Sequence, residues 1–236
     1  MCGRYTLTSS DERRLGSRFQ ISLDETGDAG LGRFNVAPTQ EVLTVQGGGE
    51  ADSESAAERR AVLARWGLVP FWAKDLKVGY RMINARAEGL LKSRAYAPLV
   101  KKQNNRCLIL ADGFYEWMKA ENPKSPKQPV RFTVDGGEPF AFAGLTTSRE
   151  WEGDELTSCT IITTDANEEV ARVHDRMPVI LPDPEAEAAW MSGELGPEEA
   201  VSLCRPLDPA RITAKPANTS VNKVGGAKES REMLEA

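Results

Sequence analysis

Short runs of alternating hydrophobic and polar residues cover most of this chain. Eight of them are rich in β-branched and aromatic residues and are bounded by Gly, Pro or Asn, a pattern typical of β-strands. The predicted strands lie at 33–38, 41–46, 60–70, 106–117, 130–135, 140–147, 158–166 and 177–182. Helices do not alternate regularly with these runs, so the pattern does not favour a parallel βαβ fold.

Helical periodicity is less common along the chain. It predicts helices at 9–19, 84–102, 165–174, 182–193 and 196–204. Because strands dominate and helices decorate them, we expect the α+β class with a mainly antiparallel, curled sheet. The chain shows no internal repeat and no domain boundary, which predicts a single compact domain over residues 2–226 and a charged C-terminal tail over 227–236.

Two polar segments between predicted strands are expected to be loops. Residues 46–58 are Gly-rich and acidic, which predicts a flexible hairpin excursion. Residues 119–129 contain three Lys and three Pro, and we expect them to join two strands.

Composition places the chain among ordinary globular proteins, with 40% hydrophobic and 28% charged residues in 236. No apolar run approaches the ~20 residues that span a bilayer, and the first residues lack a signal-peptide pattern. We therefore expect a cytoplasmic protein with no membrane partner. The net charge of −5 is unevenly distributed, because residues 59–119 carry 13 Lys/Arg and four Asp/Glu. This asymmetry indicates a basic face that suits nucleic acid, although solvated surface lysines would give the same count.

The four cysteines are widely spaced and form no C-x-x-C pair, which argues against a structural zinc site and a disulfide framework. Cys107 and Cys159 lie in apolar strand-like runs and are interpreted as inert core thiols. Cys2 differs because it directly follows the initiator methionine. Once Met1 is removed, Cys2 presents a free α-amine and a thiol on adjacent carbons, a 1,2-aminothiol.

Two titratable residues are candidates for proton transfer. His174, the only histidine, lies where a helical pattern passes into an apolar strand, and its side chain titrates near neutral pH. Glu116 ends an apolar strand between two aromatic residues, where desolvation would raise its pKa. A structural histidine and an outward-facing glutamate are the alternative interpretations.

Polar and aromatic residues elsewhere suggest contacts with a nucleic acid. Asn84 and Arg86 lie at a strand-to-helix transition, where they either face a site or cap the helix. Aromatic residues in "RWGLVPFW" are suited to stacking on unpaired bases or to filling a core, and we expect the core to take at least one of Trp66, Phe71 and Trp72. Guanidinium groups match phosphate oxygens, and the candidates are Arg4, Arg33, Arg65, Arg81, Arg86, Arg94 and Arg176.

The motifs "MCGRY", "RFNVAP", "RWGLVPFW", "INARAE", "ADGFYEW" and "HDRMPVIL" occur in one order along the chain. Together they resemble the SRAP family, the SOS-response-associated peptidases, also called abasic-site processing proteins. The resemblance extends from Cys2 to the "SVN" at 220–222. It implies a compact α+β domain around a β-barrel-like core.

The resemblance also implies a function. Members of this family bind single-stranded DNA containing an abasic site and attach to it covalently through the N-terminal cysteine. Matched residue by residue, the implied catalytic residues are Cys2, Asn84, Glu116 and His174. The implied DNA-binding residues are Arg4, Pro38, Trp72, Arg86, Arg94, Thr163 and Arg176. The family name further implies cysteine-type autopeptidase activity that removes Met1.

The chemistry of an aminothiol agrees with this implication. The Cys2 α-amine would attack the C1′ aldehyde of the open-chain sugar to give an imine, a lyase-type intermediate, and the thiol would then close a thiazolidine ring. This reaction requires no cofactor and no metal. We expect a monomer that associates with the nucleoid when bound to DNA, with replication-fork proteins as candidate partners.

Two other functions fit parts of the sequence. N-terminal-nucleophile glutamine amidotransferases also begin Met-Cys-Gly and use Cys2 as the nucleophile, but the chain lacks their glutamine-binding stretch and a synthase domain. A non-covalent binder of single-stranded DNA, in which Cys2 is incidental, is the second alternative.

Overall fold

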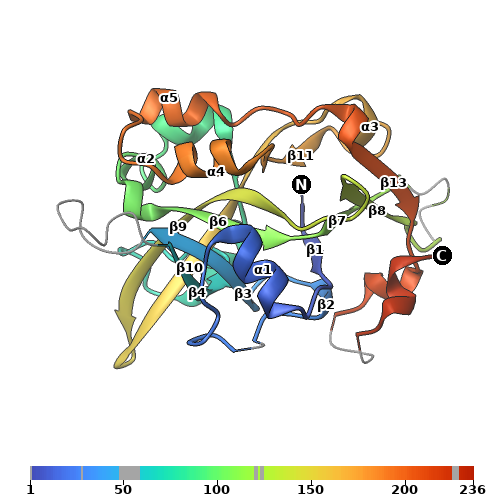
Figure 1. The fold of residues 1–236 in the computed structure, drawn as a ribbon, viewed down its shortest axis with the longest axis horizontal. Helices are drawn as coiled ribbons and strands as arrows, with labels where there is room; N and C mark the ends of the chain where they lie inside the picture. Colours follow the sequence, from blue (N-terminus) through green and yellow to red (C-terminus); the bar gives the residue numbers. More distant parts are fainter. Residues whose placement is uncertain (1, 28, 48–58, 120–121, 123–124, 225–228) are drawn as a thin grey trace.

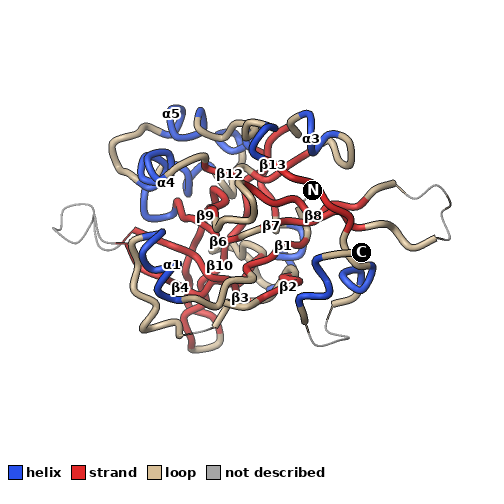
Figure 2. Tube along the Cα trace, turned by 45° about the vertical axis from the view of Figure 1, so that its right-hand side comes forward, coloured by secondary structure: helices blue, strands red, loops and turns tan. Residues whose placement is uncertain are grey.

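The computed structural model describes residues 2–27, 29–47, 59–119, 122, 125–224 and 229–236. Strands form the centre of the molecule and short helices lie around them (Figures 1 and 2). Strand pairing divides the sheet structure into a barrel and a five-stranded sheet packed against it. The expected α+β class, with one compact domain and a mainly antiparallel, barrel-like core, is confirmed.

Five strands close the barrel. Each pairs with the next, and the last returns to the first, in the order β4, β3, β6, β9 and β10. Only the closing pair, β10 with β4, is parallel within this ring. The strands are β3 (Glu41–Gly47), β4 (Arg59–Trp66), β6 (Arg106–Ala111), β9 (Phe140–Trp151) and β10 (Asp154–Asp165). Three short strands extend the ring, namely β5 (Asn84–Arg86) and β11 (Arg176–Pro178) on β10, and β12 (Ile180–Leu181) on β9.

The second sheet is antiparallel and brings the N-terminal strand into its interior. Its strand order is β13 (Ile212–Pro216), β8 (Pro129–Val134), β7 (Gly113–Trp117), β1 (Arg4–Leu7) and β2 (Arg33–Val36). Alternation along β1 and β7 points Tyr5 and Phe114 toward the barrel. Tyr5 packs edge-on against Trp66 at 5.3 Å, and Phe114 stacks on Phe132 at 5.0 Å. This aromatic layer fixes the N-terminal strand, and with it the residues that precede it.

The helices are short and lie mainly at one end of the barrel, where α2, α4 and α5 gather (Figure 1). The α-helices are α1 (Glu12–Phe19), α2 (Ala97–Val100), α3 (Glu168–Ala171), α4 (Pro184–Met191) and α5 (Pro197–Ser202). The 3-10 turns are η2 (Leu76–Arg81), η3 (Ala87–Lys92), η4 (Gln103–Asn105), η5 (Pro209–Arg211), η6 (Thr219–Asn222) and η7 (Arg231–Leu234). No helix of the described residues is long and apolar enough to cross a membrane.

The predicted helix over 84–102 is wrong at its first three residues and is not continuous after them. Residues 84–86 form β5, which pairs in parallel with Ile161–Thr163 of β10, and η3 and α2 follow it. Pairing with the barrel therefore overrides the local helical pattern. The loop predicted at 46–58 begins where β3 pairs with β4, but residues 48–58 lie outside the described part of the chain. The loop predicted at 119–129 lies between the paired strands β7 and β8, and its residues 120–121 and 123–124 lie outside the described part of the chain.

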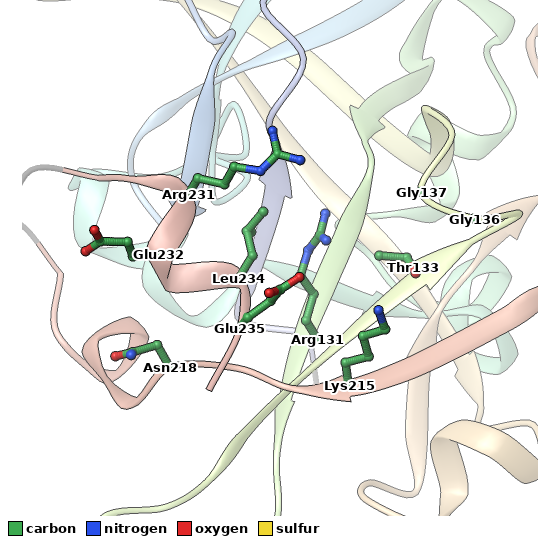
Figure 3. Close-up of a pocket in the computed structure, with 10 residues that line it drawn as sticks. All are labelled: Arg131, Thr133, Gly136, Gly137, Lys215, Asn218, Arg231, Glu232, Leu234 and Glu235. Atoms are coloured by element: carbon green, nitrogen blue, oxygen red, sulfur yellow. The ribbon is translucent and has the colours of Figure 1, made fainter.

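The C-terminal residues pack on the outer face of the five-stranded sheet. Met233 is buried against Tyr115, and the Glu229 carboxylate accepts hydrogen bonds from the backbone of Phe34 and Asn35. A cavity of about 690 Å³ lies between η7 and strands β8 and β13 (Figure 3). Arg131 and Lys215 line it from the strands. Residues beyond position 226 therefore contact the body of the protein. The domain limit at residue 226 itself stays a prediction.

Candidate active site

Cys2 lies two residues before the start of β1 and is completely buried. Its Sγ lies 3.6 Å from the backbone oxygen of Arg4. Burial raises the pKa of the Cys2 thiol well above its usual range, and the nearby Glu116 carboxylate raises it further. The thiol is therefore neutral at physiological pH, unlike the thiolate of a cysteine protease.

Asn84 anchors the backbone of Cys2. As the first residue of β5, it is placed by the pairing of that strand with β10, and its Nδ2 donates to the Cys2 carbonyl oxygen at 2.8 Å. Its Oδ1 is buried and has no hydrogen-bond partner among the described residues. Asn84 therefore lies in a strand and caps no helix, and it keeps one acceptor available beside Cys2.

Glu116 lies on β7 and points inward. Its Cα pairs with Val130, on the same face of the sheet as Phe114, and only 3% of the residue is exposed. Burial raises the pKa of the Glu116 carboxyl, and the neighbouring His174 opposes that shift. The alternative of an outward-facing glutamate is wrong, and the desolvation expected from the sequence is confirmed.

His174 follows α3 and is oriented by the chain that comes after it. Its Nδ1 accepts a hydrogen bond from the Arg176 backbone N–H at 3.0 Å. The Asp175 carboxylate lies equally close to Nδ1, but the backbone N–H is a fixed donor, so Nδ1 acts as the acceptor in the neutral ring. The proton of neutral His174 then lies on Nε2, which makes Nε2 a donor.

An open cleft of about 490 Å³ connects these residues with their surroundings. Its lining includes Arg4, Glu116, Trp117, Lys127, His174 and Asn222. Glu116 and His174 therefore share one cleft. Cys2 adjoins this cleft because it lies near Glu116, and Asn84 adjoins it through its hydrogen bond to the Cys2 backbone. Sequence reasoning missed Lys127 and Asn222, because a lysine in a polar loop and an asparagine near the chain end carry no distinctive local signal.

The predicted DNA-binding residues lie in different environments. Arg4 is tied to the protein, with Nη1 donating to Asn35 Oδ1 at 2.8 Å and to the Val221 oxygen at 2.6 Å. Arg86 and Arg94 are exposed, on β5 and between η3 and α2. These two guanidinium groups are accessible to a phosphate.

Thr163 and Arg176 are buried in the structure. Thr163 Oγ1 donates to the Ala85 oxygen at 3.5 Å. The Arg176 guanidinium contacts both Glu88 carboxylate oxygens at 3.0 Å, Asp165 Oδ1 at 2.7 Å and the Thr163 oxygen at 2.8 Å. Both side chains hold β10 against the segment that carries Arg86, and their contact with DNA stays a prediction.

The aromatic residues of "RWGLVPFW" divide as expected. Trp66 is fully buried and donates to the Ile83 oxygen, whereas Trp72 is 47% exposed and Phe71 is 78% exposed. The chain turns away after β4 at Gly67, whose φ of 125° and close approach to Gly79 exclude a side chain. Pro38 is half-buried.

Arg149 from β9 holds the loop that presents Phe71 and Trp72. Its Nη1 donates at 2.9 Å to the backbone oxygens of Pro70 and Ala73, on either side of the two aromatic residues. The exposed rings therefore project from a fixed loop, which lowers the entropic cost of stacking on a base.

Cys107 and Cys159 are buried, as expected for core thiols, and Cys204 is buried as well. Cys107, Cys159 and Cys204 are buried and unpaired to one another, and burial raises the pKa of each thiol. None of them lines the cleft.

Comparison with known proteins shows similarity over the whole chain. The chain is 40% identical to the abasic site processing protein YoqW of Bacillus subtilis over 243 residues, covering 100% of both chains. It is 36% identical to the abasic site processing protein HMCES of Gallus gallus, covering 74% of this chain and 57% of that protein. A crystal structure of a protein from Bacteroides thetaiotaomicron has the same fold, with a TM-score of 0.83 at 20% identity and full coverage of both chains. The family model described as SOS response associated peptidase (SRAP) matches residues 1–224, and the chain belongs to this family.

Proposed function

We propose that this protein recognises abasic sites in single-stranded DNA and attaches to them through the α-amine and thiol of Cys2. Its relatives YoqW and HMCES are named abasic site processing proteins, which supports a role in the response to DNA damage. The observation that carries the proposal is the placement of Cys2, which is buried beside Glu116 and anchored by Asn84.

The proposed reaction begins with attack by the α-amine nitrogen of Cys2. The α-amine of Cys2, freed by removal of Met1, attacks the C1′ aldehyde of the open-chain deoxyribose, and loss of one water gives an imine. The thiol then adds across the C=N bond, with sulfur bonding to C1′ and the thiol proton passing to nitrogen. The product is a thiazolidine, and the second step is intramolecular because one residue supplies both groups.

Glu116 and His174 are suited to the proton transfers. Burial raises the pKa of the Glu116 carboxyl, which suits it to donate a proton to the departing hydroxyl and to accept one in the next step. His174 lines the same cleft and, as a donor through Nε2, assists opening of the sugar ring. The neutral state of the thiol favours attack by the amine before the thiol.

The exposed basic and aromatic residues are proposed to hold the strand. Arg86 and Arg94 contact phosphates, Trp72 stacks on a base, and Pro38 supports the place where the bases separate. Arg4 extends this contact to the cleft.

Removal of Met1 by the same site is a further part of the proposal. Met1 itself lies outside the described residues. Glu116→Ala or His174→Ala protein isolated from cells should retain Met1, as measured by intact mass. Complete removal in both variants would show that another enzyme does this.

The covalent step is tested with a single-stranded oligonucleotide that contains one abasic site. Wild-type protein should gain the mass of the oligonucleotide less one water, and the adduct should survive heat and SDS. Cys2→Ala keeps the α-amine, so its imine should appear only after borohydride reduction. An undamaged oligonucleotide is the control, and absence of a wild-type adduct would refute the proposal. Released ammonia from glutamine would instead support the amidotransferase alternative.

A further inference from the structure

The cleft beside Glu116 and His174 has a second wall, built by the β7–β8 hairpin and the C-terminal segment. Lys127, two residues before β8, lines this wall together with Asn222 of η6 and Trp117 of β7. Neither Lys127 nor Asn222 is needed for the bond-forming steps proposed above.

Asn222 joins the two arms of the hairpin. Its Oδ1 accepts a hydrogen bond from Trp117 Nε1 at 2.6 Å, and its Nδ2 donates to the Lys127 backbone oxygen at 3.1 Å. Gln128, the next residue, donates to the Ala217 oxygen at 2.8 Å. The backbone of Lys127 is therefore fixed at the mouth of the cleft, while its side chain remains exposed.

The charge of Lys127 is not neutralised within the described part of the chain, where no carboxylate lies at ion-pair distance from its amine. Arg4 lines the same cleft, and its hydrogen bonds go to an amide and a backbone oxygen. Glu116 is the acidic group of the lining, and it is buried at the inner side. Two cations therefore line this cleft.

The cavity beneath η7 offers a contrast. Arg131, Lys215 and Arg231 line it, but Glu232 and Glu235 line the same cavity (Figure 3). Positive charge there is offset by nearby carboxylates. The cleft at Lys127 is the better site for an anion.

We propose that Lys127 binds a backbone phosphate next to the abasic sugar, and that Asn222 is the positioning residue that holds Lys127 there. This inference rests on the proposed function, because it supplies the phosphate contact on the hairpin side of the lesion. An ammonium group on a flexible stem suits a phosphate whose position shifts as the sugar ring opens. The bound strand would then be held from β5 on one side and from the hairpin on the other.

The test measures equilibrium binding to an oligonucleotide with a tetrahydrofuran abasic analogue, which has no aldehyde and forms no crosslink. Lys127→Gln should weaken binding about two- to fivefold, as expected for one exposed ionic contact. The slope of log Kd against log salt concentration should fall by about 0.7, the value for one phosphate contact on a single strand. Lys127→Arg should restore both, and Lys215→Gln, on β13, should change neither.

An uncharged linkage in the DNA backbone identifies the phosphate that Lys127 contacts. Replacing one phosphate beside the analogue with a methylphosphonate should weaken binding of wild-type protein and leave that of Lys127→Gln unchanged. Asn222→Ala should lower the salt slope when it is introduced into wild-type protein but not when it is introduced into Lys127→Gln. This difference separates positioning of Lys127 from a general loss of stability.

Unchanged affinity and salt slope in Lys127→Gln would overturn the inference, as would equal losses with the methylphosphonate in both proteins. Natural abasic DNA, mixed with the same proteins, reports separately on the proposed function. A wild-type protein that binds the analogue yet forms no adduct contradicts the crosslinking reaction and leaves the Lys127 measurement interpretable.

Discussion

Asp112 connects the N-terminal strand to the rest of the five-stranded sheet, and its removal should unfold the protein far more readily. The carboxylate is 3% exposed, at the bend between β6 and β7. It accepts hydrogen bonds from Thr6 Oγ1, Thr8 N and Thr8 Oγ1, each at 2.6 Å, and Arg131 Nη2 lies 3.2 Å away. The second half of β1 and the residue that follows it thus depend on one buried group.

The size of the effect follows from burial. The side chains of Asp112 and Arg131 are 4% and 14% exposed, so Asp112→Ala leaves a charged guanidinium without its partner in a desolvated place. Breaking such a pair costs about 3–5 kcal/mol. For a chain of this length, each kcal/mol shifts Tm by about 2–4 °C, so the expected drop is about 6–20 °C.

Urea unfolding and thermal unfolding of Asp112→Ala measure this cost. The matched control is Asp135→Ala, which breaks an ion pair with Arg211 whose side chains are 42% and 34% exposed. An exposed pair contributes at most about 1 kcal/mol. If the two variants lose the same stability, the buried Asp112 cluster does not hold β1 in place.

Other predictions concern the site itself. Because the folded-state pKa of Glu116 is raised, protonated Glu116 stabilises the folded protein below the ordinary pKa of 4.5, and this stabilisation is lost as pH rises. The free energy of unfolding of Glu116→Gln, measured by urea unfolding, should therefore increase relative to that of wild type as pH rises. The same variant should crosslink about 10²-fold more slowly, in timed adduct assays. Asn84→Ala removes the anchor of Cys2 and should slow crosslinking about tenfold, with Cys2 otherwise intact. Trp72→Ala should weaken DNA binding by about 1–3 kcal/mol without loss of stability, whereas Trp66→Ala should lower the free energy of unfolding by about 3–5 kcal/mol.

Much of the fold could be predicted from alternation, because burial on one face imposes a two-residue period. The predicted strands at 41–46 and 130–135 correspond closely to β3 and β8. The run at 106–117 is predicted as one strand because apolar residues lie on both sides of Asp112, yet the chain bends there and continues in another sheet. That bend depends on hydrogen bonds to Thr6 and Thr8, about a hundred residues earlier, which local pattern does not contain.

Individual site residues were predictable to different degrees. Glu116 could be found from its aromatic neighbours, because desolvation follows from an apolar strand. Asn84 was ambiguous, since an asparagine at a strand-to-helix boundary caps helices more often than it anchors another strand. The hydrogen bond to Cys2 exists only because β5 pairs with β10, a contact across more than seventy residues.

The buried state of Cys2 bears on the order of the chemical steps. A thiol whose pKa is raised by burial and by the Glu116 carboxylate is a weak nucleophile until it transfers its proton. An α-amine has an ordinary pKa of about 7.7–8.0, so a useful fraction is neutral at pH 7. In the proposed reaction, nitrogen therefore attacks first, and the imine supplies the basic nitrogen that accepts the thiol proton as sulfur bonds to carbon. Under that proposal, burial of the thiol delays attack by sulfur until the electrophile is already attached to the same residue.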